Sequence, residues 1–260
     1  MPTREEILSG LTWIANEYTG IAIVWHLLIL LLIAALFARW KPGNNLMILM
    51  LSSLLMSVSG FAFLQGNYFN AAVFAFLLIA SILVSLRSGR KAIRGDRSWT
   101  GIIGLLLIAF GLLYPEFVNT DSQLDYLYSA PTGLIPCPTL SILIGFALLY
   151  RGCSSSIWTM TLGISGLFYG LVGVFYLHMN IDWFLVAASA FLLLNKLIFL
   201  KKSMSLSGHH WCICRNTSCP FKKSMIFLAL GLTLYPLYEV CFVENGALHG
   251  RLVIDLFFIF

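Results

Sequence analysis

The sequence predicts an all-α, polytopic transmembrane helix bundle of about eight spans, and two observations carry that prediction. Of the 260 residues, 59% are apolar and 10% are charged, and the mean hydropathy is +0.89. A soluble domain is about 45–50% apolar and about 25% charged, so a soluble core could not bury this much apolar surface. The apolar residues also form long continuous runs without the alternation of barrel strands, which favours helices.

A helix needs about 20 mostly apolar residues to cross the hydrocarbon layer, which is roughly 30 Å thick. Because lipid offers no hydrogen-bond partner to the backbone, each crossing segment must be helical. The fifth apolar run is the shortest and predicts a partly broken helix. The predicted spans are residues 20–38, 46–64, 69–86, 101–118, 138–150 with its flanks, 157–177, 182–200 and 224–243.

Residues 1–19 precede the first span and form a pattern of their own. The charges in this stretch are not those of a secretory signal peptide, so the first span is expected to direct insertion. Apolar side chains recur near helical spacing at Ile7, Leu8, Leu11, Ile14, Ala15 and Tyr18. This spacing predicts an amphipathic helix on the outer membrane surface. The alternative is a plain polar N-terminus.

The loops sort by charge, and this sorting predicts the orientation. Of the 16 Lys and Arg residues, all but Arg4 and Arg251 fall on one side of an eight-span arrangement, and the acidic residues other than Asp96 fall on or near the opposite side. Cytoplasmic loops are enriched in Lys and Arg, so both termini are expected to be extracytoplasmic. The net charge of +5 is then a topology signal and a contact with anionic lipid, with no nucleic-acid partner.

The expected organisation follows from these spans and loops. It comprises an amphipathic surface helix at 1–19, a seven-span membrane bundle at 20–200, a cytoplasmic basic Cys/His loop at 201–223, and an eighth span with an outer tail at 224–260. The ends of the fourth and eighth spans resemble each other, because each places Tyr-Pro before a Glu. This similarity indicates either a parallel 4+4 duplication, as in some transporters, or convergent membrane composition. The proline should kink or end each helix.

Glycines mark one face of the sixth span. Such a seam favours close approach of a neighbouring helix, and the alternative is a narrow solute path lined by backbone. The seam comprises Gly163, Gly166, Gly170 and Gly173, and a shorter version in the fourth span comprises Gly101, Gly104 and Gly111.

The most unusual segment is the outer loop at residues 128–139. Its prolines, Pro131, Pro136 and Pro138, fix their own φ and push the preceding residues out of the helical region. A rigid non-helical stretch is therefore expected to lead into the fifth span, either buried in protein or lining a cavity. Cys137 is either a thiol presented at a defined place or an inert cysteine in a stiff loop cap.

These motifs resemble those of a family of uncharacterised bacterial multi-pass membrane proteins, catalogued only as a domain of unknown function. That family has a polar start with an aromatic residue and an Asn, several spans, a Tyr-Pro at a span end, and a loop close to Ala-Pro-Thr-x-Gly-x-Pro-Cys-Pro-Thr. The matching residues lie within about residues 5–200 and are Tyr114-Pro115, Ala130-Pro131-Thr132-Gly133 and Pro136-Cys137-Pro138-Thr139. Some members are labelled permeases, so the resemblance implies a transport protein of the bacterial cytoplasmic (inner) membrane.

Several polar groups are expected at the depth of this loop. An ionisable group within a span is a functional candidate by default. Imidazole, thiol and carboxylate groups suit a zinc or copper ion and equally a proton relay. The alternatives are that His178 and Asp182 are solvated loop residues and that His26 bonds a neighbouring helix. The predicted substrate or ion site comprises His26, Glu116, Pro136, Cys137, Pro138, His178 and Asp182.

A second candidate site lies in the predicted cytoplasmic loop. Three thiols and two imidazoles could supply a tetrahedral set for zinc, or thiolates for Cu(I). The spacing is not that of a standard zinc finger, and a lipidated or merely reduced basic loop is the alternative. The residues are His209, His210, Cys212, Cys214 and Cys219. A disulfide between Cys137 and Cys241 at the oxidising outer face is a further expectation left open.

The combined pattern predicts a transporter-like permease for a small solute or metal ion, with its site near the outer face. No nucleotide-binding loop, nucleophile elbow or zinc-protease motif is present, so ATP is not expected to supply energy within this chain. Whether the chain is an enzyme is left open, with a non-enzyme favoured. Zinc or copper is the only cofactor that the ligands suggest. The alternatives are a thiol-based membrane redox protein and a non-catalytic sensor or assembly subunit. The expected partners are the lipid bilayer, the solute or metal ion, and a second copy in a homo-oligomer.

Overall fold

The computed structural model describes residues 3–37, 43–87, 98–120, 122, 125–150 and 156–206, and within these ranges the chain is helical and contains no β-strand. The helices are α1 (Arg4–Glu17), α2 (Thr19–Phe37), α3 (Asn44–Leu64), α4 (Tyr68–Arg87), α5 (Trp99–Leu112), α6 (Tyr126–Ser129), α7 (Pro136–Leu149), α8 (Ser156–Leu171) and α9 (Trp183–Leu206). A π-helical turn at Val172–Tyr176 continues α8, and a 3₁₀ turn at Asn180–Asp182 leads into α9. A helix thus occurs in each of the first seven predicted spans, which confirms the all-α class.

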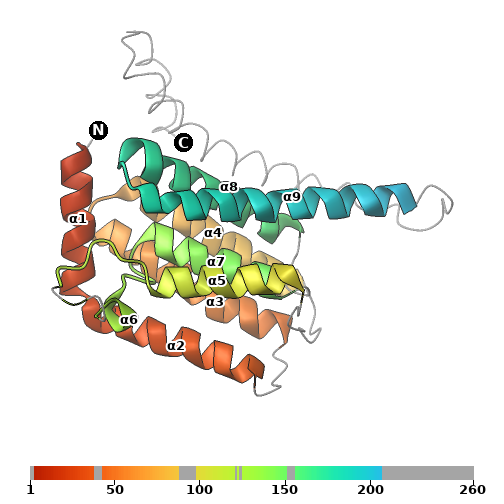
Figure 1. Cartoon of the computed structure of the whole chain (residues 1–260), viewed down its shortest axis with the longest axis horizontal. Helices are drawn as coiled ribbons and strands as arrows, with labels where there is room; N and C mark the ends of the chain where they lie inside the picture. Colours follow the sequence, from red (N-terminus) through yellow and green to blue (C-terminus); the bar gives the residue numbers. More distant parts are fainter. Residues whose placement is uncertain are drawn as a thin grey trace, which may run out of the picture.

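The long helices run roughly along one common axis, and α1 stands across one end of the bundle (Figure 1). The capping box at Thr3 starts α1: the Thr3 hydroxyl accepts from the Glu6 N–H at 3.3 Å, and the Glu6 carboxylate accepts from the Thr3 N–H at 2.7 Å. Helices α1 and α2 meet at a bend of 72°. The apolar face of α1 packs through Ile14 against Leu134 and Ile135. These two residues belong to the segment at 128–139, which we call the proline-rich loop. The expected helix before the first span is therefore present.

Helix α7 is the centre of the bundle (Figure 1). Its residues are buried from Pro136 through Leu148, and it contacts α3, α5, α8 and α9. Helix α7 presents apolar or small side chains in every direction, as a helix enclosed by others must. The shortest predicted span is therefore the most enclosed one.

The prolines at the start of α7 begin the helix instead of interrupting it. Ile135 is extended and precedes Pro136, the first helical residue. The first turn of a helix has N–H groups without intrahelical partners, so the missing donors of Pro136 and Pro138 cost nothing there. The fifth predicted span is therefore one continuous helix, and the expectation of a partly broken helix there was wrong. The irregular backbone is instead the buried stretch from Ala130 to Ile135.

Helix α5 ends earlier than the predicted span 101–118. It stops at Leu112, and Leu113 and Tyr114 are already outside the helix. Pro115 explains this end, because the residue before a proline is driven out of the helical region. The chain then reaches Phe117 with a left-handed φ of 72°. The early end turns the side chain of Tyr114 into the bundle, where it is fully buried.

Both glycine seams are sites of close helix packing. A Cβ on Gly104 of α5 would lie 2.5 Å from the carbonyl oxygen of Gly145 of α7, and one on Gly145 would lie 2.6 Å from that of Gly104. In α8, a Cβ on Gly166 would overlap Ser189 and one on Gly170 would come within 2.8 Å of Val186. Side chains and backbone of the neighbouring helices thus fill the seams, which confirms the packing interpretation over a solute path.

Not every helix is long enough to cross a bilayer by itself. By length and composition, α3, α4, α8 with its π-helical turn, and α9 with the turn before it qualify, and the bent pair α1–α2 adds a fifth candidate if it is one span. Helices α5 and α7 have 14 residues each, which is about 21 Å of helix. The described residues therefore contain four or five candidate membrane spans, compared with seven predicted. The eighth predicted span, 224–243, lies outside the described residues.

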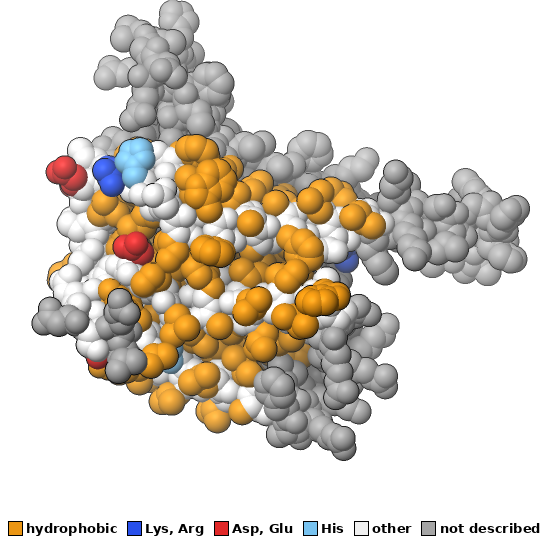
Figure 2. Space-filling view, in the orientation of Figure 1, with side chains coloured by type: hydrophobic (Ala, Val, Ile, Leu, Met, Phe, Trp, Pro, Cys, Tyr) orange, Lys and Arg blue, Asp and Glu red, His pale blue; other side chains and the backbone are white. Residues whose placement is uncertain are grey.

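The surface of the bundle has the polarity of a membrane protein. Figure 2 shows apolar side chains covering the middle of this face, whereas the acidic side chains lie toward the end that carries α1. Large apolar side chains such as Leu31, Leu86 and Leu106 are exposed. Such a contiguous apolar surface would be unfavourable in water and is expected in lipid.

Candidate functional site

A buried acidic side chain lies where α8 and α9 turn back on each other. Asp182 ends the 3₁₀ turn before α9 and is 0% exposed. His178 has a left-handed φ of 57°, which lets the chain reverse here. The Met179 N–H donates to the Gly173 carbonyl at 2.8 Å, and the Asp182 N–H donates to the Met179 carbonyl at 3.1 Å. These bonds fix Asp182 at the positive N-terminal end of α9, which favours a carboxylate.

Two neutral groups from distant segments donate to the Asp182 carboxylate. The Tyr114 hydroxyl donates to Oδ1 at 2.8 Å, and the Cys137 thiol donates to Oδ2 at 3.3 Å. Tyr114 follows α5, Cys137 lies in the first turn of α7, and Asp182 precedes α9. We call these three residues the acid–thiol cluster. No basic side chain in the described part of the chain pairs with Asp182, so its charge has no cationic partner there.

Aromatic rings enclose the acid–thiol cluster. Tyr114 stacks on Phe117 with ring centroids 6.2 Å apart and meets Phe110 edge-on at 5.6 Å. Tyr169 of α8 is also buried in the core that contains Cys137, and its hydroxyl donates to the Asn70 side chain at 2.9 Å. The cluster is therefore screened from bulk solvent by hydrocarbon and rings.

The proline-rich loop is held in place by hydrogen bonds to its own ends and to α5. The Thr132 hydroxyl donates to the Gly111 carbonyl at 2.9 Å. The Gly133 N–H donates to the Thr139 hydroxyl at 2.9 Å, and that hydroxyl donates to the Ile135 carbonyl at 2.7 Å. These bonds satisfy polar groups that would otherwise be buried without partners. Rigid irregular backbone thus positions Cys137, as the sequence indicated.

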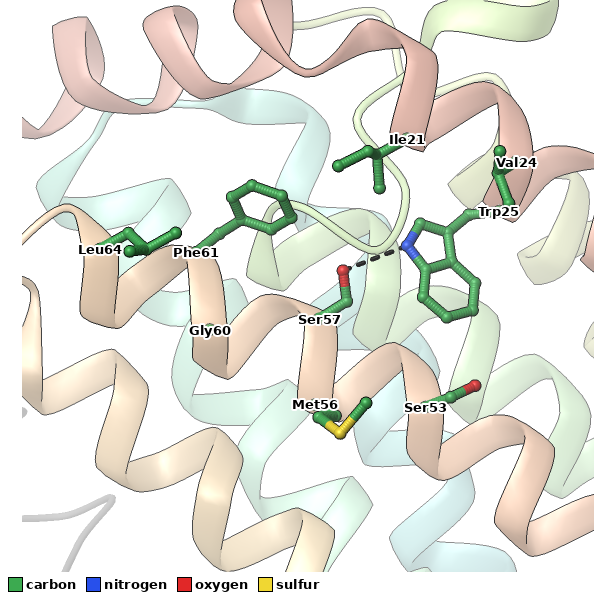
Figure 3. Close-up of a pocket in the computed structure, with 9 residues that line it drawn as sticks. All are labelled: Ile21, Val24, Trp25, Ser53, Met56, Ser57, Gly60, Phe61 and Leu64. Atoms are coloured by element: carbon green, nitrogen blue, oxygen red, sulfur yellow. Dashed lines mark hydrogen bonds between the residues drawn. The ribbon is translucent and has the colours of Figure 1, made fainter.

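A lateral groove lies between α2 and α3, next to this loop (Figure 3). Its volume is about 410 Å³, and apart from two serines its lining is apolar and aromatic. Trp25 forms one wall and donates to the Ser57 hydroxyl at 3.1 Å. The indole also lies where a side chain on Gly133 would be, and Gly133 has a left-handed φ of 75°. The groove is therefore in contact with the loop that carries Cys137.

His26 is buried, but it does not join the acid–thiol cluster. It is 3% exposed, and its ring nitrogens lie 2.8 Å from the Ala22 carbonyl and 2.9 Å from the Leu112 carbonyl. Leu112 is the last residue of α5, and its carbonyl has no partner within the helix. His26 thus connects α2 to the end of α5. This agrees with the alternative that His26 bonds a neighbouring helix.

The remaining predicted members of the outer site have other places. His178 is exposed in the turn before α9, and Glu116 is partly buried beyond the end of α5. Pro136 and Pro138 contribute the first turn of α7 and flank Cys137. Among the described residues no group of three or more His, Cys, Asp or Glu side chains could hold a metal ion. The expected zinc or copper set of His26, Cys137, His178 and Asp182 is therefore not assembled.

The second predicted metal site lies outside the described residues. This holds for His209, His210, Cys212, Cys214 and Cys219, and also for Cys241 as the disulfide partner proposed for Cys137. Within the described residues, Cys137 is a free thiol.

Sequence reasoning missed two members of the site. Tyr114 was noted only as part of a Tyr-Pro motif at a helix end. Its position just before a helix-ending proline could have indicated that its side chain leaves the helix and turns into the bundle. Gly173 was assigned to packing, whereas it makes room for the Asp182 carboxylate itself. Nothing in the local sequence connects either residue to Asp182.

Comparison with known proteins adds no relative to this description. The chain matches no protein-family model, no curated protein and no solved structure.

Proposed function

We propose that this chain is a multi-pass, transporter-like permease for a small solute, with the acid–thiol cluster as its site. The observation that carries this proposal is the fully buried Asp182 carboxylate, whose hydrogen bonds within the described residues come from the neutral donors Tyr114 and Cys137. An uncompensated charge in an apolar bundle is costly, so such groups in membrane proteins are usually retained for a function.

The proposed membrane arrangement extends the same argument. We place the chain in the bacterial cytoplasmic membrane with eight spans and both termini extracytoplasmic. The acidic side chains at the α1 end support this orientation, because acidic residues collect away from the cytoplasmic loops. Helix α1 would then lie in the outer interface, and the 72° bend between α1 and α2 supports this placement. The short helices α5 and α7 can still belong to crossings, because irregular backbone is tolerated at membrane depth when protein buries it.

A metal ion is the less supported substrate, because the described residues offer it no set of three ligands. A thiol-based redox protein is also less supported. The Cys137 thiol is 8% exposed and donates to a carboxylate, whereas reactive thiols are accessible and lie beside basic groups.

The test is uptake by the purified chain reconstituted into liposomes, using labelled amino acids, sugars, small carboxylates, Zn²⁺ and Mn²⁺ as probes. We expect at least one probe to be taken up, and uptake of that probe to fall at least tenfold in Asp182→Asn. Asp125→Asn is the matched control, because the Asp125 carboxylate bonds the hydroxyls of Thr120 and Tyr128, which are not part of the acid–thiol cluster. Uptake that is unchanged in Asp182→Asn, and also in the double variant Cys137→Ser with His26→Ala, would overturn the assignment of the site.

A further inference from the structure

The hydrogen-bond partners of Asp182 are both groups that can reverse their roles. A tyrosine hydroxyl donates and accepts, and a thiol is a weak donor and a weak acceptor. In the structure, Tyr114 and Cys137 each donate to one oxygen of the Asp182 carboxylate. If the carboxyl group gained a proton, either partner could accept it in a hydrogen bond, since each can play both roles. The partners of Asp182 are thus compatible with both of its protonation states.

We propose that Asp182 is a proton-binding site and that the proton is the coupling ion of the permease. This inference rests on the proposed function and adds the identity of the ion. The step is a simple protonation: a hydronium ion from the outer solution gives its proton to the Asp182 carboxylate and leaves as water, while the Cys137 thiol and the Tyr114 hydroxyl keep their own hydrogens.

The packing around Asp182 leaves no room for a larger ion. Asp182 and Tyr114 are fully buried, and Cys137 is 8% exposed. The side of the carboxylate that faces α8 is closed by Gly173, where even a Cβ would overlap Oδ2. A sodium, potassium or divalent ion needs several oxygen ligands at 2 Å or more, so it would have to displace Tyr114 or Cys137. A proton adds no heavy atom and fits as the structure stands.

Among the described residues, the titratable groups that interact with the carboxyl are themselves neutral or acidic. Two basic side chains lie at the same turn, but Arg4 donates to the Leu177 carbonyl at 3.1 Å and His178 is exposed. The segment after α5 contributes Tyr114 and Glu116, α7 contributes Cys137, and α8 contributes Tyr169, which interacts with Cys137. No cation among the described residues neutralises Asp182 in place of a proton. Glu116 is partly buried beyond the end of α5 and is a second acidic group near the site.

The experiment is infrared difference spectroscopy of the full chain in lipid, between acidic and alkaline buffer, in H₂O and in D₂O. We expect the carbonyl stretch of a protonated carboxylic acid at acidic pH, shifted in D₂O, together with a change in the S–H stretch as the Cys137 hydrogen bond changes. Other carboxyl groups and thiols also titrate between these buffers, so each signal is read as wild type minus variant. Asp182→Asn should remove one component of the carbonyl band and the S–H change at Cys137, and Cys137→Ala should remove only that S–H change. Asp125→Asn, which removes a half-buried carboxyl group outside the acid–thiol cluster, should leave both components unchanged.

If Asp182→Asn does not fold, wild-type protein with ¹³C-labelled aspartate side chains replaces it. The band should then shift with the label, and shift again in Tyr114→Phe because the carboxyl loses one partner. Absence of any buried-aspartate band between the two pH values, or a band insensitive to the label, would overturn the inference even if uptake depends on Asp182. A titrating Asp182 in a chain that transports none of the probes would instead leave the proton site standing and reject the proposed function.

Discussion

The carboxylate of Asp182 occupies the space that a side chain on Gly173 would fill. A Cβ built on Gly173 would overlap the Asp182 oxygen that accepts from Cys137. Gly173 lies in the π-helical turn that continues α8, a feature that often marks functional positions. The acid is therefore packed directly against bare backbone, and the two residues depend on each other.

We expect Gly173→Ala to destabilise the protein by roughly 2–3 kcal/mol, the upper part of the range for overpacking a core. Asp182 would have to move, and its hydrogen bonds to Tyr114 and Cys137 would lengthen. Gly60→Ala in α3 is the matched control, because a Cβ there meets nothing within 4 Å. That change should be neutral or stabilising by up to about 1 kcal/mol, since alanine favours the helix. Thermal unfolding in detergent measures both, and equal effects of the two substitutions would contradict the packing.

Tyr114→Phe should cost about 1–3 kcal/mol, because it leaves one oxygen of a buried carboxylate without a donor. Cys137→Ala should cost less, because a thiol is a weak donor, and Cys137→Ser should recover part of that loss. Unfolding free energies of the two single variants and of the double variant form a cycle. A coupling energy of zero between Tyr114 and Cys137 would show that they do not share the Asp182 carboxyl group.

Gly133→Ala should be more damaging than Gly66→Ala, although both glycines have a left-handed φ, of 75° and 72°. The backbone strain, about 1–3 kcal/mol, is common to both. A Cβ on Gly133 would also overlap the Trp25 indole, whereas one on Gly66 would meet nothing within 4 Å. The difference in unfolding free energy should therefore report the clash alone. Trp25 fluorescence should change in Gly133→Ala only; an identical loss in both variants would place Trp25 away from the loop.

The loop before α6 should respond to acid through Asp125. This carboxylate accepts hydrogen bonds from the hydroxyls of Thr120 and Tyr128, which hold the pKa of Asp125 below its usual value. A lowered folded-state pKa contributes stability that is present above the ordinary Asp value, about 3.9, and is lost as the pH falls through the folded value. The difference in Tm between wild type and Asp125→Asn should be constant near neutral pH and should narrow only below about pH 4.

Tyr128→Phe provides the control for that titration. It removes one of the two donors to Asp125, so the folded-state pKa of Asp125 is lowered less. The stability that Asp125 contributes should then be fully lost at a higher pH than in wild type. A difference in Tm that varies between pH 6 and pH 8 would contradict the assignment to Asp125.

Cys137 should react slowly with a membrane-impermeant maleimide when the five other cysteines are replaced by serine. The thiol is 8% exposed and engaged with Asp182. In the same background with Cys137 also replaced, Tyr128→Cys should react quickly from outside, because that position is 48% exposed and the proposed orientation places it on the outer side. Rapid labelling of Cys137 would favour the redox alternative, and labelling of Tyr128→Cys only from inside would invert the proposed orientation.

The sequence by itself determined the helices and the character of their surfaces. The apolar runs predicted a helix at every described span, because a long apolar segment can satisfy its backbone only internally. The glycines at Gly104 and Gly166 indicated close packing, because no other residue lets two backbones approach so nearly. Pro115 indicated where α5 must end. These signals are local: each depends on a residue and its near neighbours.

The tertiary structure alone decided which polar groups meet. Tyr114 and Asp182 are 68 positions apart in the sequence, and Cys137 and Asp182 are 45 apart. Periodicity says which face of a helix is apolar, but several helices that are apolar on all sides can be rotated and paired in many ways. His26 and Asp182 looked equally suited to one site, yet His26 bonds the end of α5. Close packing at glycine contacts holds α7 against α5, and α8 against α9 and the turn that carries Asp182. The thiol and the carboxylate meet only once these helix pairs are assembled.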